Sequence, residues 1–173
     1  MAQTAVVVEL PEVDPIVDPY RRVFDPARAR GMPGHITLLY PFIDSDAVDD
    51  AAVESLREAA AGVAPFDVAF ERVRWFGSTV AWLAPEPSQP FVDLISGLVP
   101  RFPDYPPYEG RFAENIPHLT IGESGLPALA DAVEALRRRL PLRSRAKDLS
   151  LMVRERTGWK AMHRLPFTAE PWG

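Results

Sequence analysis

The chain has 173 residues and a formal net charge of -5, enough for one domain with a full core but unsuited to a broad basic face for nucleic acid. It contains no cysteine, which excludes disulfides, thiolate metal sites and a cysteine nucleophile. No apolar run approaches the roughly 18 residues of a membrane span, and no basic segment precedes the short apolar start, so we expect a soluble cytoplasmic protein.

The first part of the chain predicts two strands separated by a helix. Residues 4–10 include three consecutive valines, a pattern that favours a strand buried on both faces. Apolar residues at helical spacing predict an amphipathic helix that begins at Asp14 and stops near Pro26. A turn cluster at 31–34 leads into a second predicted strand over 35–42.

Four aspartates follow this strand and allow two interpretations. They could belong to a metal cluster or to a helix start, where an Asp or Ser caps the first turn and acidic side chains face the positive end of the helix dipole. The run lacks the glycine and the final glutamate of a calcium-binding loop. We therefore favour a helix over 47–61 that ends at Gly62, and no metal site; the aspartates are Asp44, Asp46, Asp49 and Asp50.

The rest of the chain predicts two hairpins and two further helices. Alternating runs over 66–76 and 78–85 predict a hairpin around Gly77. A helix is expected over 88–99, and the proline-rich segment 103–117 is expected to be an irregular loop. The remaining predicted elements are a strand from His118, a helix over 128–140 with a basic end, and a hairpin around Gly158.

Two His-x-Thr triplets, at 35–37 and 118–120, are the most informative feature of the sequence. In a strand, residues two apart point to one face, so each histidine would share a face with its threonine and the middle residue would point into the core. With three histidines and 14 serines and threonines in the chain, chance produces two such triplets about 2% of the time. Both segments are apolar enough for central strands.

The order of the elements suggests a duplication. Each copy contains a motif strand, a helix and a hairpin; the histidines are 118 - 35 = 83 residues apart, and the turn glycines are 158 - 77 = 81 residues apart. The repeats span roughly 35–84 and 118–167. A pseudo-twofold axis between two such lobes would bring the motif strands together at a central groove.

Two imidazoles at one groove favour acid–base chemistry. The ordinary histidine pKa near 6.5 lets one ring be neutral while the other is charged. Threonine hydroxyls on the same face would donate hydrogen bonds to an oxyanion. Because the sequence shows no thiol, metal-ligand cluster or glycine-rich phosphate loop, we expect metal-free cleavage or transfer at a phosphodiester.

The paired triplets resemble those of the 2H phosphoesterase superfamily, and the segment HITLLYPF resembles its 2'-5' RNA ligase-like branch. The resemblance implies one domain over 1–173 with an α+β, bilobal fold, in which antiparallel sheets line a central cleft and helices lie outside. It implies hydrolysis of a 2',3'-cyclic phosphate or a related RNA-end phosphodiester, without a metal or cofactor. The partner would be a nucleotide or short RNA end, with no membrane or obligate protein partner. His35 and His118 would be the acid–base pair, and Thr37 and Thr120 would hold the phosphate.

Two alternatives stay open. A 2'-5' RNA ligase would use the same residues in the reverse direction, and a nucleotide- or RNA-binding module would keep the lobes but show little turnover. Two intact triplets argue against a pure binder, because binding alone does not require both imidazoles. The sequence does not decide which histidine acts as the acid.

Several residues are candidates for auxiliary roles. A cation near the phosphate would come from the loop before the second motif or from the last hairpin, and the candidates are Arg111, Arg156, Lys160 and Arg164. Tyr108 is a candidate for stacking on a base, together with Tyr105 and Phe112, although anchoring the loop to the protein explains these rings equally well. His163 on the last strand is a weaker candidate that fits a surface or cleft wall.

Tyr40 and the hairpin aromatics are expected to have structural roles. Tyr40 follows Thr37 by three residues, so regular strand alternation would turn it away from the motif face and into the core. The hairpin aromatics are expected to pack in the core or against the hairpins, and they are Trp75, Phe76, Trp82 and Trp159.

Overall fold

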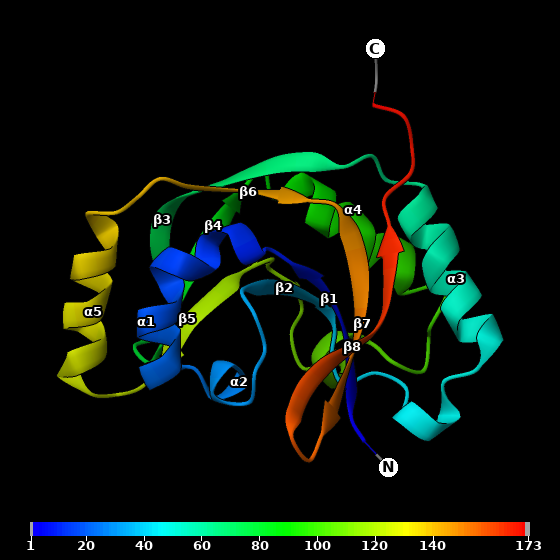
Figure 1. Ribbon diagram of the computed structural model, residues 1–173, viewed down its shortest axis with the longest axis horizontal. Coiled ribbons are helices and arrows are strands. Elements are labelled where there is room, and N and C mark those ends of the chain that lie inside the picture. Colours follow the sequence, from blue (N-terminus) through cyan, green and yellow to red (C-terminus); the bar gives the residue numbers. More distant parts are fainter. Residues whose placement is uncertain (1, 172–173) are drawn as a thin grey trace.

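The computed structural model describes residues 2–171, which form two four-stranded sheets (Figure 1). The first sheet has the order β2-β1-β7-β8 and the second β5-β4-β3-β6, and all neighbouring strands are antiparallel. The strands of the first sheet are β1 (Thr4–Glu9), β2 (His35–Leu39), β7 (Asp148–Glu155) and β8 (Gly158–Pro166). Those of the second are β3 (Phe66–Phe76), β4 (Val80–Glu86), β5 (Leu119–Glu123) and β6 (Leu142–Ala146).

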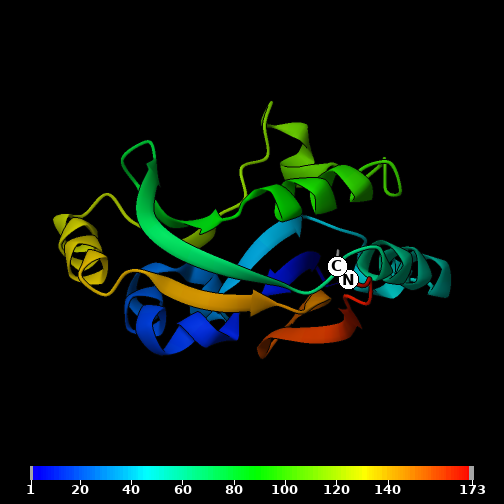
Figure 2. The same ribbon diagram turned by 90° about the horizontal axis from the view of Figure 1, so that it is seen from above.

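Within the described residues, five α-helices surround the two sheets, with α3 and α5 at opposite ends (Figure 1 and Figure 2). Together with the sheets they confirm the predicted bilobal α+β fold. In the described part of the chain, no helix is long and apolar enough to cross a membrane. The helices are α1 (Asp14–Phe24), α2 (Pro26–Ala29), α3 (Asp50–Ala61), α4 (Gln89–Leu98) and α5 (Pro127–Arg137).

Local signals set the helix boundaries much as the sequence predicts. Helix α1 ends at Phe24, just before Pro26, and a second short helix begins there. At the start of α3, the Asp49 side chain accepts a hydrogen bond of 2.8 Å from the backbone N–H of Ala52. The helix-start interpretation of the aspartate run is therefore correct, although α3 begins three residues later than predicted.

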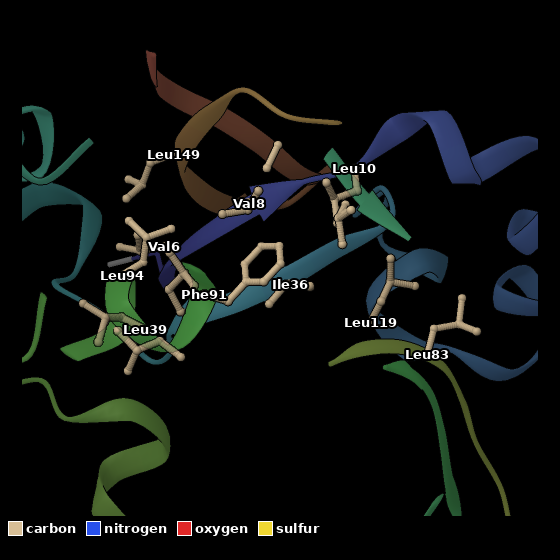
Figure 3. Close-up of a cluster of buried hydrophobic side chains, with 14 of the residues drawn as sticks. Val6, Val8, Leu10, Ile36, Leu39, Leu83, Phe91, Leu94, Leu119 and Leu149 are labelled. Atoms are coloured by element: carbon tan, nitrogen blue, oxygen red, sulfur yellow. The ribbon is translucent and has the colours of Figure 1, made fainter. Parts of the chain in front are cut away.

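The two motif strands, β2 and β5, lie at the edges of their sheets rather than at the centres. The prediction of central strands was wrong because a single core serves both sheets. Ile36 and Leu119, the middle residues of the triplets, are both fully buried in one hydrophobic cluster (Figure 3). The edges contact each other, β2 against β5, without hydrogen-bonding into a common sheet.

The chain passes back and forth between the two sheets. Helix α1 follows a strand of the first sheet but contacts β5 of the second, and α4 follows a strand of the second but contacts β2 of the first. The β3–β4 hairpin shares a sheet with β5, and the β7–β8 hairpin shares a sheet with β2. Each sheet thus takes strands from both halves of the chain, and the repeat limits 35–84 and 118–167 stay a prediction.

Strand β6 has no counterpart among the predicted elements. Its buried positions are Leu142, Ser144 and Ala146, which alternate with two exposed arginines. Only one of these three side chains is large and apolar, so the five-residue alternation gives a weak signal. The Ser144 hydroxyl donates a 2.6 Å hydrogen bond to Glu12, which satisfies the polar group that the strand buries.

Candidate active site

His35 and His118 are held by the same local contact in two different sheets. His35 Nδ1 lies 2.7 Å from the Pro33 carbonyl oxygen, and His118 Nδ1 lies 2.7 Å from the Ile116 carbonyl oxygen. A carbonyl oxygen only accepts hydrogen bonds, so Nδ1 carries the hydrogen in both rings. The neutral form of each ring therefore presents Nε2 as a proton acceptor, and the protonated form presents Nε2–H as a donor.

All four polar residues of the triplets line one cavity of about 440 Å³. This volume falls within the range of small-molecule sites, roughly 300–1,000 Å³. The structure thus brings His35, Thr37, His118 and Thr120 together, as the strand alternation predicts. The other lining residues are Ala5, Asp25, Pro26, Ala27, Arg30, Met32, Tyr40, Tyr108, Glu123, Arg154 and Trp159.

A β-bulge follows the threonine in each motif strand. In β2, Thr37 pairs with Val7 of β1 and Leu39 pairs with Val6, so Leu38 between them is an extra residue. In β5 the same shift leaves Ile121 extra. An extra residue reverses the alternation of side chains beyond it, so the third residue after each threonine returns to the threonine's face.

Tyr40 and Glu123 are these third residues, and both line the cavity. The prediction that Tyr40 turns away from the motif face was therefore wrong, since it assumed an unbroken strand. Glu123 was not predicted as a site residue. It places a carboxylate beside Thr120 in a cavity that otherwise suits an anion.

The cavity lowers the pKa of both histidines. Burial, and next the positive charge of Arg21, lower the pKa of His35 to about 4. Burial also lowers the pKa of His118. Both rings are therefore neutral in the free protein at pH 7, and a bound anion is needed to favour the protonated form of either one.

Arg21 is a fully buried cation whose charge acts on His35. Its Nη2 lies 2.9 Å from Asp25 and donates a 3.1 Å hydrogen bond to the Met32 carbonyl oxygen. Asp25 is itself only 5% exposed, and its other oxygen accepts from the Ala27 backbone N–H at 2.9 Å, which caps α2. The pair links the last turn of α1 to the start of α2, and Asp25 also lines the cavity.

Three aromatic rings enclose His118. The Phe76 and Trp82 rings meet the imidazole edge to face, with centroids 5.0 and 5.9 Å away, and the Tyr108 ring stacks on it at 6.4 Å. The packing role expected for Phe76 and Trp82 thus includes the removal of water from one catalytic candidate. Trp159, also expected only to pack, lines the cavity itself.

Tyr108 is fixed by its backbone as well as by its ring. Its φ of 51° and that of Glu109, 58°, lie in the left-handed region that residues with a side chain rarely adopt. Its backbone N–H donates a 2.8 Å hydrogen bond to the Tyr40 carbonyl oxygen. The Tyr108 phenol lies near Thr37, and burial raises its pKa, so the group stays neutral.

The sequence also matches a known family. The model of the 2'-5' RNA ligase superfamily matches residues 9–158, a segment that includes both triplets and most of the chain. The chain belongs to the 2'-5' RNA ligase superfamily. This membership confirms the resemblance that the triplets indicate.

Two solved structures share the fold of this 2'-5' RNA ligase superfamily member. One is TT0787 of Thermus thermophilus, with a TM-score of 0.65 and 19% sequence identity. The other is Escherichia coli LigT in complex with 3'-AMP, with a TM-score of 0.57 and 19% identity. Each similarity covers 98% of this chain and 100% of the other. A comparison with curated protein sequences gave no match.

The auxiliary residues predicted for this superfamily member are only partly at the cavity. Tyr108 lines it, whereas Arg111 lines an adjoining apolar pocket and pairs with Glu109 at 3.3 Å. Arg164 pairs with Glu9 at 3.0 Å, and neither it nor His163 is among the residues that line the cavity. The structure therefore gives Arg164 and His163 no place in the site.

The cations at the cavity are Arg30 and Arg154, which the sequence did not single out. The other two predicted cations are not among the residues that line the cavity: Lys160 pairs with Glu155 at 2.7 Å, and Arg156 lines a neighbouring surface pocket that shares Arg154 with the cavity. Arg30 reaches the cavity from the turn before β2, and Arg154 from β7. Both arginines line the cavity because distant segments pair, so no local sequence pattern predicts their position.

Proposed function

We propose that the protein is a metal-independent phosphoesterase that opens a 2',3'-cyclic phosphate, or a related RNA-end phosphodiester, by acid–base catalysis. The observation that carries this proposal is that His35 and His118 are held in one tautomer and line one cavity with Thr37 and Thr120. Membership of the 2'-5' RNA ligase superfamily supports it. So does the 3'-AMP complex of LigT, because a nucleoside 3'-phosphate is one product of ring opening.

The tautomers define the proton transfers. Nε2 of the neutral ring accepts a proton from water as the water oxygen forms a bond to phosphorus. Nε2–H of the other, protonated ring gives its proton to the ribose oxygen as the bond between that oxygen and phosphorus breaks. The product is a phosphate monoester with a free hydroxyl beside it, and the two rings have exchanged protonation states. Each transfer typically contributes 10²–10⁴ in rate.

The threonines and the substrate charge complete this mechanism. The hydroxyls of Thr37 and Thr120 donate to the non-bridging phosphoryl oxygens, where negative charge grows in the transition state. The neutral phenol of Tyr108 lines the same cavity near Thr37. Because both imidazoles are neutral in the free protein, the anionic phosphodiester raises the pKa of the ring that becomes the acid.

Turnover of 2',3'-cyclic nucleotides in the presence of a chelator tests this proposal. The wild type should form a 2'- or 3'-monoester, and the His118→Ala variant should form almost none. His163→Ala is a matched control, since the third histidine lies outside the cavity. Activity that appears only after a divalent metal ion is added would show that the proposed chemistry is wrong.

Ligation in the reverse sense is a second candidate, which the family itself favours. The same residues would then activate a ribose hydroxyl of a second RNA end in place of water. The discriminating measurement supplies RNA with a cyclic phosphate end and a second RNA with a 5'-hydroxyl end. Longer products would indicate ligation, and monoester ends alone would indicate hydrolysis. Tight nucleotide binding without any product would indicate a binding module.

A further inference from the structure

Arg30 and Arg154 are cations without a carboxylate partner at the cavity. Neither belongs to any ion pair within residues 2–171, whereas Arg28, two residues before Arg30, is paired with Asp18. Arg154 Nη1 has only a long contact, 3.4 Å, with the neutral amide oxygen of Gln3. In a protein with a net charge of -5, two guanidinium groups that line one cavity outside any ion pair of the described residues point to an anionic ligand.

The backbone joins the segments that carry the two arginines. Arg154 of β7 lies directly opposite Trp159 of β8 in the strand register. The Trp159 backbone N–H donates a 2.7 Å hydrogen bond to the Arg30 carbonyl oxygen. Trp159 therefore joins the two segments that carry the arginines, although they are 124 positions apart (154 - 30).

Gly158 makes this junction possible. Its φ is 125°, and a Cβ at this position would lie 2.5 Å from the Arg30 carbonyl oxygen. No other residue type both adopts this φ readily and leaves room for the neighbouring backbone. The arrangement of Arg30, Trp159 and Arg154 is thus built into the fold rather than dependent on mobile side chains alone.

The cavity is chemically asymmetric around the histidines. Arg154 and Trp159 belong to β7 and β8 of the first sheet and Arg30 to the turn before β2, whereas Glu123 supplies a carboxylate from β5 of the second sheet. Asp25, the other carboxylate that lines the cavity, is already paired with Arg21. A guanidinium group binds phosphate through two parallel hydrogen bonds. If the scissile phosphate occupies the place between His35 and His118, the arginines are available for a different phosphate of the same ligand.

We propose that Arg30 and Arg154 form a second phosphate subsite. This proposal rests on the proposed function and narrows its substrate class: the preferred substrate carries a phosphate on the 5' side of the nucleotide whose cyclic phosphate is opened. That group is either a terminal 5'-phosphate or the internucleotide phosphate of an RNA end. A 2',3'-cyclic nucleoside monophosphate alone would leave the subsite empty.

Product binding tests the subsite without requiring turnover. Calorimetry would compare adenosine 3',5'-bisphosphate with adenosine 3'-phosphate, which differ only in the 5'-phosphate. We expect the wild type to bind the bisphosphate about tenfold tighter or more, as a pair of charge-assisted hydrogen bonds would give. The ratio of the bisphosphate affinity to the monophosphate affinity should fall toward one in Arg30→Ala and in Arg154→Ala. In Arg30→Lys and Arg154→Lys this ratio should be intermediate.

Arg138→Ala is the matched control, because Arg138 is an exposed arginine after α5, outside the cavity. Its affinity ratio should equal that of the wild type. A wild-type ratio near one, or a ratio that the Arg30 and Arg154 variants leave unchanged, would overturn the subsite. Thermal unfolding of each variant would establish that it is folded before its ratio is interpreted.

Kinetics then separate this inference from the proposed function. The substrates are a 2',3'-cyclic nucleotide, the same nucleotide with a 5'-phosphate, and a dinucleotide with a cyclic phosphate end. A higher kcat/KM for either phosphate-bearing substrate that depends on Arg30 and Arg154 supports the subsite. The substrate with the higher kcat/KM shows whether the subsite binds a terminal 5'-phosphate or an internucleotide phosphate. Equal kcat/KM for all three overturns the subsite and leaves the phosphoesterase intact. Product binding that depends on the arginines, without any turnover, leaves the subsite and overturns the phosphoesterase.

Discussion

Tyr40 and Glu123 occupy equivalent positions in the two motif strands, each three residues beyond a motif threonine and each facing the cavity. The bulge after each threonine produces this equivalence. One strand thus presents a phenol where the other presents a carboxylate. Because a carboxylate repels a phosphate, the side chain at position 123 should influence which anions the cavity accepts.

Replacement of Glu123 by Gln should strengthen the binding of phosphate ligands. Removing one exposed like charge predicts an affinity gain on the order of two- to fivefold at low salt, and a smaller gain at high salt. Calorimetry with adenosine 3'-phosphate at two salt concentrations measures both effects. Glu114→Gln is the control, since Glu114 lines the adjoining apolar pocket but not this cavity. Weaker binding in Glu123→Gln would mean that the carboxylate contacts the ligand favourably.

Anion binding should tighten as the pH falls. The pKa of His35 is about 4 in the free protein, and an anion beside the ring raises it. Between these two pKa values the complex holds more protons than the free protein, so affinity increases with acidity, on the order of tenfold from pH 7 to pH 5. Sulfate is a suitable probe because it does not itself titrate in this range.

His35→Gln should reduce this pH dependence, because a glutamine side chain does not titrate. The same calorimetric titrations, repeated in buffers with different heats of ionisation, count the protons taken up on binding. Sulfate binding that involves no proton uptake and does not vary with pH would contradict the assignment of the anion to the histidines.

Loss of Asp25 should be costly because it would leave the buried Arg21 charge with only the more distant carboxylate of Asp14, 3.8 Å away. Asp25→Asn keeps a side chain that caps α2, yet it should lower the free energy of unfolding by about 3–5 kcal/mol. The double variant Arg21→Met/Asp25→Asn removes both charges and should be more stable than Asp25→Asn alone. Urea unfolding measures the two differences. A double variant less stable than the single one would show that the ion pair is not what matters here.

Gly158→Ala should destabilise the protein more than Gly77→Ala. Gly77 lies in the turn of its hairpin and Gly158 follows the turn as the first residue of β8, and both have positive φ. A Cβ on Gly77 would have no atom within 4 Å, whereas a Cβ on Gly158 would collide with the Arg30 carbonyl oxygen. The strained backbone alone costs about 1–3 kcal/mol, and Gly158→Ala adds displacement of Arg30. Unfolding measurements give the stabilities, and the bisphosphate affinity ratio should fall only in Gly158→Ala.

The sequence predicts the placement of the triplets well because their signal is local. Strand alternation alone puts His35 on the face of Thr37 and sends Ile36 to the core. Helix ends are also local, as the cap at Asp49 shows. These features need only the spacing of neighbouring residues.

Features that depend on distant segments are not visible in the sequence. The apolar character of β2 suggests a central strand, but it reflects a core shared between two sheets. The bulge that turns Tyr40 into the cavity is defined only by pairing with β1. Arg30 and Arg154 converge only because a residue of β8 bonds to the turn before β2. For this reason most of the predicted cations do not line the cavity, whereas His35 and His118 do.

The central claim is that His35 and His118 act together on one phosphate. The kcat/KM for a 2',3'-cyclic nucleotide, measured with chelator for the wild type, His35→Ala, His118→Ala and the double variant, tests it most directly. We predict that each single change lowers kcat/KM by about 10²–10⁴, and that the double variant loses little more than a single one, because acid and base act as a unit. Near-wild-type kcat/KM in either single variant would contradict the claim. So would a fold loss in the double variant equal to the product of the fold losses in the two single variants.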